Sequence, residues 1–115
     1  MPHRALVTKE LAELLGALSH PHRIRIVEEL RSGERNVNAL REALGISHSG
    51  VSQHLMVMRA NRLVSERREG RQVFYQLRQP ELATWLLDAT GFLEKETVDA
   101  NELRKAISKT RKDWA

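Results

Sequence analysis

The chain has 115 residues and a mass of 13.2 kDa, the size of one ordinary domain, which argues against a multidomain enzyme or a long repeat array. Hydrophobic residues make up 41% and charged residues 30%, a mixture that folds rather than stays disordered. Cysteine is absent, which excludes disulfides, thiolate metal sites and cysteine nucleophiles. The longest apolar run, residues 55–58, is far shorter than a membrane span, so the sequence predicts a soluble, cytoplasmic protein.

Positive charge is concentrated in the first 77 residues and at the C-terminal end. Residues 1–77 carry 12 basic and 8 acidic side chains, residues 78–103 carry 2 and 6, and residues 104–115 carry 5 and 1. All but one of the basic residues in the first block are arginines, whose planar guanidinium suits phosphate oxygens and base edges. Nucleic acid is therefore the leading partner, and a solvated charged surface is the alternative reading.

Apolar residues at helical spacing predict four short helices in the first 60 residues. The first spans about residues 6–18 and carries the stripe Leu11, Leu14, Leu15 and Leu18. The second begins at Pro21 and ends at residues 32–33, and the third lies between a cap at Asn36 and Gly45. The fourth follows a cap at Ser47. Only three residues separate the last two helices.

The pattern changes to strands after residue 62. Residues 63–68 and 72–77 are rich in β-branched and aromatic side chains, and Gly70 between them can take the positive φ of a tight turn, which predicts a hairpin. A fifth helix follows Pro80, and a sixth begins at Asp99. The predicted fold is mainly α with one small β-hairpin, and the predicted domains are 1–97 for the compact domain and 98–115 for a basic C-terminal helix or tail.

A short helix pair followed by a basic hairpin is typical of a winged helix-turn-helix, in which the second helix enters the major groove and the hairpin forms the wing. Short or planar polar side chains on the fourth helix can approach base edges closely. Two alternatives do not involve DNA. The helix pair could serve only to pack the core, and the polar face of the fourth helix could simply be solvated. The predicted DNA-contacting residues are Ser47, His48, Ser49, Ser52, Gln53, His54, Arg59, Arg67, Arg68 and Arg71.

Three ordered segments carry a more specific signal: residues 18–27 (LSHPHRIRIV), 44–55 (LGISHSGVSQHL) and 67–77 (RREGRQVFYQL). Together they resemble the ArsR/SmtB family of bacterial winged-helix repressors over about residues 11–95. The resemblance implies bases facing Ser49, Ser52 and Gln53, a wing served by Arg67 and Arg71, and an inducer that weakens operator binding. It also implies a homodimer whose first and fifth helices pair through Leu11, Leu14, Leu15, Leu18, Leu82, Trp85, Leu86, Ala89 and Leu93.

The sequence departs from this family at its known metal sites. The positions of the Cys-x-Cys ligand pair hold Asn36 and Asn38, which cannot supply a thiolate. The positions of the second site hold Gln79, Glu81, Phe92 and Lys95, of which only the glutamate could coordinate a metal. The resemblance therefore implies that both family metal sites are lost.

The five histidines are explained more simply as caps, surface groups or DNA contacts, because His20 and His22 stand two residues apart and His48 and His54 fall on the DNA-contacting helix. The sequence thus assigns no metal and no cofactor, and leaves a histidine site outside the family pattern as an open alternative.

Trp85 and Phe92 either line a cleft for a small apolar effector or belong to the core. The basic C-terminal residues could touch DNA, cover the dimer seam or keep the chain soluble.

The predicted function is a sequence-specific DNA-binding regulator, acting as a homodimeric repressor on an inverted repeat. Its partners are double-stranded DNA and a second copy of the chain, with no membrane, and with a small-molecule effector or protein partner unidentified. The alternative is a winged-helix module that binds an acidic protein. An enzyme is not expected, because Gly-x-Ser-x-Gly, His-Glu-x-x-His and glycine-rich phosphate loops are all absent from the sequence.

Overall fold

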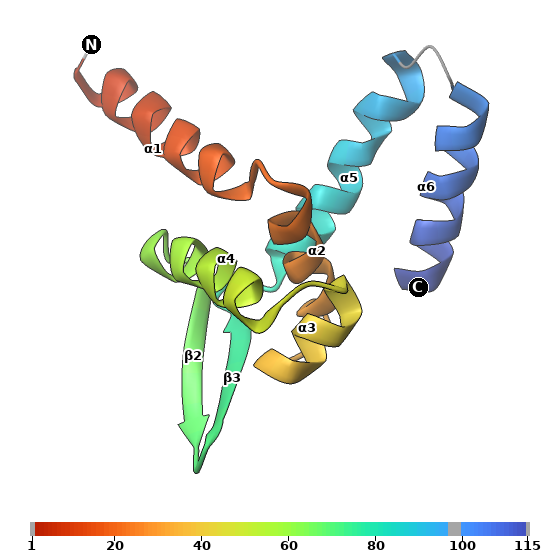
Figure 1. The fold of residues 1–115 in the computed structure, drawn as a ribbon. Coiled ribbons are helices and arrows are strands. Elements are labelled where there is room, and N and C mark those ends of the chain that lie inside the picture. The colour runs from red at the N-terminus through yellow and green to blue at the C-terminus, as the bar shows by residue number, and fades with distance from the viewer. Residues whose placement is uncertain (1, 97–99, 115) are drawn as a thin grey trace. The chain divides into compact units, whose positions relative to one another are not determined.

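A computed structural model describes residues 2–96 and 100–114 (Figure 1). The chain divides into two compact units, Met1–Pro80 and Glu81–Ala115. The predicted domain boundary at residue 97 and the predicted start of the last helix at Asp99 lie outside the described residues. Within the described ranges, no helix has the length and apolar character needed to cross a bilayer.

The first unit contains four helices and a small sheet in the order helix, helix, strand, helix, helix, strand, strand. Its elements are α1 (Pro2–Leu18), α2 (Pro21–Glu29), β1 (Arg35–Asn36), α3 (Val37–Leu44), α4 (His48–Ala60), β2 (Val64–Glu69) and β3 (Gln72–Leu77). All four predicted helices are present, and α1 begins about one turn earlier than its leucine pattern indicates.

The helix ends follow from local chemistry. Pro21 opens α2, where its missing N–H costs no hydrogen bond. Oδ1 of Asn36 accepts a hydrogen bond of 2.8 Å from the backbone N–H of Ala39 and so caps α3, and Gly45 ends this helix at a φ of +67°. Oγ of Ser47 caps α4 by accepting from the backbone N–H of Gly50 at 3.1 Å. These caps fix the short turn between α3 and α4.

The sheet has the strand order β1-β3-β2 and is antiparallel throughout. The predicted hairpin is present, with Glu69 opposite Gln72 and with a φ of +60° at Gly70. The two-residue strand β1 is an addition to the prediction, in which Arg35 pairs with Tyr75 and Asn36 with Phe74. Strand β1 ties the start of α3 to the hairpin.

The core of the first unit joins α2, α3 and α4 to the base of β2. Its largest fully buried side chains are Ile26, Val27, Leu30, Leu40, Val51, Leu55, Met58 and Val64. Residues 51, 55 and 58 occupy one face of α4, so the opposite face of this helix is left for solvent or a partner.

The end of α4 is an unpredicted feature. Arg62 takes a φ of +59°, a left-handed conformation that usually falls to glycine. The N–H of Arg62 donates to the carbonyl of Arg59 at 3.0 Å, and the N–H of Leu63 donates to the carbonyl of Met58 at 2.9 Å. These two bonds form a Schellman motif, which sets the direction in which the chain enters β2.

The second unit consists of α5 (Glu81–Glu96) and α6 (Ala100–Trp114), which pack against each other. Nη1 of Arg111 lies 3.0 Å from a carboxylate oxygen of Glu94, and Nε of Arg104 donates to the Glu94 carbonyl at 3.3 Å. Trp85 and Phe92 are 47% and 76% exposed. Neither side chain is therefore buried within the described single chain, and the choice between an effector cleft and a core position stays a prediction.

The cap at Asn36 stabilises the start of α3. Asn36→Ala removes the side-chain acceptor at the start of α3 and is expected to lower the free energy of unfolding by about 1 kcal/mol. Asn38→Ala is the matched control, because Asn38 is exposed in the first turn of the same helix. Urea denaturation followed by circular dichroism measures both. Equal stability of the two variants would contradict the cap.

Candidate nucleic-acid interface

Helix α4 presents an exposed face opposite its buried face. His48, Ser49 and Gln53 are exposed on it, and Ser52 is half-buried toward the hairpin. Met56 is 69% exposed on the same face. Ser47 serves first as the helix cap, and its Oγ also lies 3.3 Å from Oγ of Ser49. The face therefore combines hydrogen-bonding groups with one apolar side chain, which is what base edges and thymine methyl groups require.

A hollow of about 300 Å³ lies between the start of α3, the start of α4 and the hairpin. Polar side chains from all three elements line it: Asn36, Asn38, His48, Ser52, Arg68, Arg71, Gln72 and Tyr75. Two arginines at a concave site are suited to a phosphate group. Tyr75 reaches this hollow from β3, and the strand pattern alone gave no reason to include it.

Arg67, expected at the DNA, forms two ion pairs with carboxylates of its own chain. Its Nη2 lies 2.6 Å from Oε1 of Glu34 and its Nη1 lies 2.7 Å from Oε2 of Glu69. Its guanidinium also covers the ring of Phe74, with 4.6 Å between the guanidinium carbon and the ring centroid. These bonds, first that to Glu34 and then that to Glu69, raise the pKa of Arg67, and the bond from Arg67 lowers the pKa of Glu34. Arg67 therefore ties the hairpin to the loop before β1.

Arg59 and Arg68 share one carboxylate at the base of the hairpin. Nη1 of Arg59 lies 3.0 Å and Nε of Arg68 lies 3.6 Å from Oε1 of Glu66. The hydroxyl of Tyr75 donates to Oε2 of Glu66 at 2.8 Å. That hydrogen bond, with smaller contributions from the two arginines, lowers the pKa of Glu66, whereas burial and the same bond raise the pKa of Tyr75. The network leaves Arg59 and Arg68 exposed but partly neutralised.

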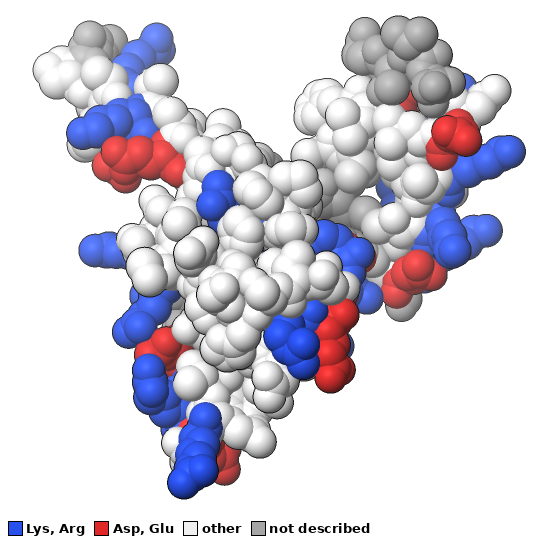
Figure 2. Space-filling view, viewed as in Figure 1, with Lys and Arg blue, Asp and Glu red and all other residues white. Residues whose placement is uncertain are grey.

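Arg71 at the hairpin turn differs from the other three arginines. It is exposed and forms no ion pair with any residue that the structure describes. Figure 2 shows Lys and Arg side chains along one edge and at the free end of the hairpin. The end of the wing is thus its most available positive charge for a phosphate group.

Arg67 is expected to contribute little to phosphate binding by the hairpin. Because Arg67 already pairs with two carboxylates, we expect Arg67→Ala to leave the slope of log affinity for DNA against log salt concentration unchanged. Arg71→Ala provides the matched comparison, with an expected fall of about one unit in that slope. Fluorescence anisotropy of labelled duplex between low and moderate salt measures both. A smaller slope for Arg67→Ala would place this residue at a phosphate after all.

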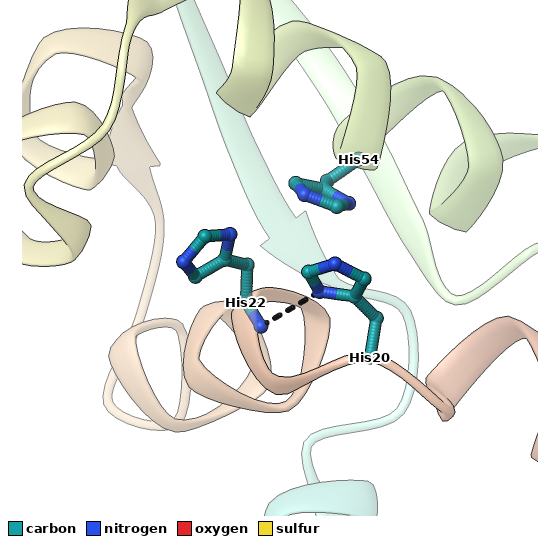
Figure 3. Close-up of side chains that lie close together, drawn as sticks. All are labelled: His20, His22 and His54. Carbon is teal, nitrogen blue, oxygen red and sulfur yellow. Dashed lines mark hydrogen bonds between the residues drawn. The ribbon is translucent and has the colours of Figure 1, made fainter.

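His54, also expected at the DNA, faces α2 rather than the exposed face of α4. Its ring centroid lies 4.3 Å from that of His20 and 5.4 Å from that of His22 (Figure 3). The cause is helical spacing, because residue 54 follows buried Val51 by three positions and precedes buried Met58 by four. Burial, and then the charges of His20, Arg23 and His22, lowers the pKa of His54. Three of the five histidines thus meet in one cluster.

The residues expected at the dimer interface differ in their exposure. Leu11, Leu15, Trp85 and Leu93 are each about half exposed, so a second chain could cover them. Leu14, Leu82, Leu86 and Ala89 are half-buried. Leu18 is only 3% exposed in the single chain. Leu18 therefore has almost no surface left to bury against a partner, and its assignment to the interface is not supported.

The described side chains at the positions of the two family metal sites cap a helix or are exposed. Asn36 is the cap of α3, Asn38 is exposed, and Phe92 is 76% exposed. Gln79 and Glu81 are also exposed, and the Lys95 side chain lies outside the described residues. Amide and aromatic groups at these positions do not form a ligand set for a transition metal.

Comparison with known proteins decides the family. Residues 20–66 match the model described as bacterial regulatory protein, arsR family. The nodulation protein NolR of Rhizobium meliloti is 32% identical over 99 residues, which are 86% of this chain and 80% of NolR. The chain belongs to the ArsR family. This membership confirms the resemblance drawn from the sequence motifs.

A second relative of this ArsR-family chain is the HTH-type transcriptional repressor SmtB of Mycobacterium tuberculosis, 41% identical over 86 residues. The match covers 75% of this chain and 64% of the repressor. Among solved structures, the homodimeric winged helix-turn-helix DNA-binding domain of Mb0332 from Mycobacterium bovis, a possible ArsR-family transcriptional regulator, has a TM-score of 0.71 at 27% identity. It covers 84% of this chain and 93% of that domain, which confirms the winged-helix fold class. None of these proteins is named as an enzyme, in agreement with the prediction for this ArsR-family chain.

Proposed function

We propose that this protein is a transcriptional repressor that binds double-stranded DNA as a homodimer at an inverted-repeat operator in the cytoplasm. The observation that carries the proposal is the exposed polar face of α4 beside Arg71 of the hairpin, which has no ion pair among the described residues. A helix of 13 residues with its apolar side buried is the element that a major groove of roughly 12 Å accepts.

The exposed side chains divide by chemistry. Gln53 and Ser49, which are exposed, and Ser52 beside the hairpin are assigned to base edges, because amide and hydroxyl groups both donate and accept hydrogen bonds. Met56 is assigned to an apolar base contact. Arg71, with Arg68 and His48 around the polar hollow, is assigned to phosphates. His54 and Arg67 are left out of the DNA contacts because other residues of the chain engage them.

Apolar residues left exposed on α1 and α5 support the homodimer. Leu11 and Leu15 lie one turn apart on α1 and are 52% and 51% exposed, and Val7 continues the stripe. A single chain in water leaves few large apolar stripes uncovered, so a second copy is the proposed cover. Two-fold symmetry then places two α4 helices about one turn of DNA apart, as an inverted repeat requires.

We also propose that regulation does not use the two metal sites known in the family. Neutral amides at residues 36 and 38 bind thiophilic metals poorly. If an effector acts at the positions of these two sites, we expect it to be a small apolar molecule or a protein.

The test is binding to the DNA upstream of the protein's own gene, measured by anisotropy at physiological salt with the chain's mass determined by light scattering. We expect a dimer that binds one upstream fragment at least about 10³-fold more tightly than a shuffled duplex. Binding of an acidic protein, with no preference among duplexes, would favour the protein-interaction module. A monomer that binds no duplex would overturn the proposal.

A further inference from the structure

The cluster of three histidines joins two elements that are far apart in the sequence. His20 is the N-cap of α2 and His22 lies in its first turn, whereas His54 projects from the middle of α4 toward them (Figure 3). One ring nitrogen from each residue lies within 4.8 Å of those of the other two. All three side chains are half-buried. Such a convergence of imidazoles is a ready set of metal ligands.

The hydrogen bonds within the chain do not account for the cluster. The backbone N–H of His22 donates to Nδ1 of His20 at 3.0 Å, which caps α2. Among the described residues, the side chains of His22 and His54 have no hydrogen-bond partner. Two imidazoles are therefore free to bind a shared ligand, and the third would have to give up its hydrogen bond to do so. Their neutral form, which carries an unshared electron pair, is the form that binds metals.

We propose that His20, His22 and His54 bind one divalent transition-metal ion, with Zn²⁺ as the best fit, through one imidazole nitrogen each. Three nitrogen ligands with a fourth position left to water form a common zinc arrangement. Tetrahedral zinc with bonds of about 2.05 Å places ligand nitrogens about 3.4 Å apart, so small side-chain rotations would close the cluster. Nitrogen ligands without thiolates disfavour soft thiophilic ions, and the lack of carboxylates among the three ligands disfavours Ca²⁺ and Mg²⁺.

This site differs from both family sites, because none of its three ligands falls at residues 36, 38, 79, 81, 92 or 95. It also changes a helix end. A neutral imidazole has only one nitrogen that can accept a hydrogen bond or a metal, so His20 cannot cap α2 and bind zinc at the same time. The bound metal would replace the cap with a direct link from the start of α2 to α4.

One charged neighbour opposes a cation. Arg23 follows His22 in α2, and its charge acts on His54. Its Nε is buried without a hydrogen-bond partner among the described residues. A guanidinium at this place weakens the attraction of a dication without removing a ligand. We therefore expect binding of moderate strength, with a Kd of about 10 μM or below for Zn²⁺.

The experiment uses the full chain without a histidine tag and measures Zn²⁺ binding against a chromophoric chelator. We expect one Zn²⁺ per chain, and a loss of affinity on the order of tenfold or more in each of His22→Gln, His54→Gln and His20→Asn. The last variant retains a good N-cap residue, so it removes the metal ligand while keeping the helix end. His48→Gln removes an exposed histidine on α4 and is the matched control. We expect this variant to bind Zn²⁺ with the affinity of the wild type.

A second readout is the thermal midpoint, which Zn²⁺ should raise in the wild type and in His48→Gln but not in His54→Gln, because a ligand that binds only the folded state stabilises it. The cobalt-substituted protein should show the visible absorption of a tetrahedral site. Equal Zn²⁺ affinity in the wild type and His54→Gln, an equal loss in His48→Gln, or no binding at about ten times the expected Kd would each overturn the proposal. DNA binding is measured separately, so its failure would leave this result untouched.

Discussion

Replacement of Leu11 and Leu15 by glutamate is expected to convert the dimer into monomers and to lower operator affinity by about 10³-fold or more, close to non-specific binding. The two side chains lie one turn apart on α1 and are each about half exposed in the single chain. A dimer that buries them would have to bury two carboxylates from each chain without partners, which is costly. A monomer reaches one half-site only and loses the linked second contact.

The control for this pair is Thr8→Glu with Ala12→Glu. These exposed residues have the same spacing on α1 and receive the same charge, but they lie to one side of the leucine stripe. Light scattering gives the mass, and anisotropy gives the affinity for operator and shuffled duplex. Circular dichroism checks that α1 stays helical. A double leucine variant that remains dimeric would show that α1 is not the interface, and the proposed pairing would have to be abandoned.

Gln53→Ala is expected to reduce the free energy of operator binding by about 1–3 kcal/mol and to relax the preference at one base pair. The reason is that the Gln53 amide is exposed on the outer face of α4 and can donate and accept at one base edge. Affinities for the operator and for a set of single-base variants measure the loss. Gln76→Ala is the control, because Gln76 is exposed on β3 and alternation places it on the sheet face opposite Tyr75.

Arg71→Ala is expected to affect DNA binding differently from Gln53→Ala. Loss of an exposed cation that pairs with none of the described carboxylates should weaken all duplexes by a similar factor, whereas loss of Gln53 should weaken the operator most. The ratio of operator to shuffled affinity therefore separates base readout from phosphate contact. If Gln53→Ala and Arg71→Ala changed this ratio equally, the division of roles between α4 and the hairpin would be wrong.

Local sequence signals predicted the elements that depend on local chemistry. Asn36, Ser47 and Gly45 are recognisable as helix ends because each satisfies backbone groups within a few residues of itself. The short strand β1 was not predictable in this way, because it exists only through pairing with Tyr75 and Phe74, which lie 40 and 38 residues after their partners. The left-handed Arg62 was missed because a non-glycine residue at that conformation has no compositional signal.

In the candidate site too, features set by local spacing were predictable and features set by contacts between distant residues were not. Helical spacing identified the exposed residues of α4. The same spacing places His54 beside the buried residues Val51 and Met58, so it could have shown that His54 does not belong to the exposed face. The spacing of His20 and His22 was misleading, since His20 is a cap with extended backbone and helical periodicity does not apply to it. The pairing of Arg67 with Glu34 joins residues 33 positions apart, so only the folded chain reveals that this arginine is occupied.

The backbone bonds at Arg62 and Leu63 have a mechanical meaning for any regulator that acts on α4. They leave no flexible linker between this helix and β2, so we expect the helix and the hairpin to move together. A hairpin arm of six residues is about 20 Å long, and a rotation of only 5° at its base would move Arg71 by about 1.7 Å. If Arg71 contacts a phosphate as proposed, such a displacement would weaken that contact, so a small rotation of α4 would be amplified at the tip of the hairpin.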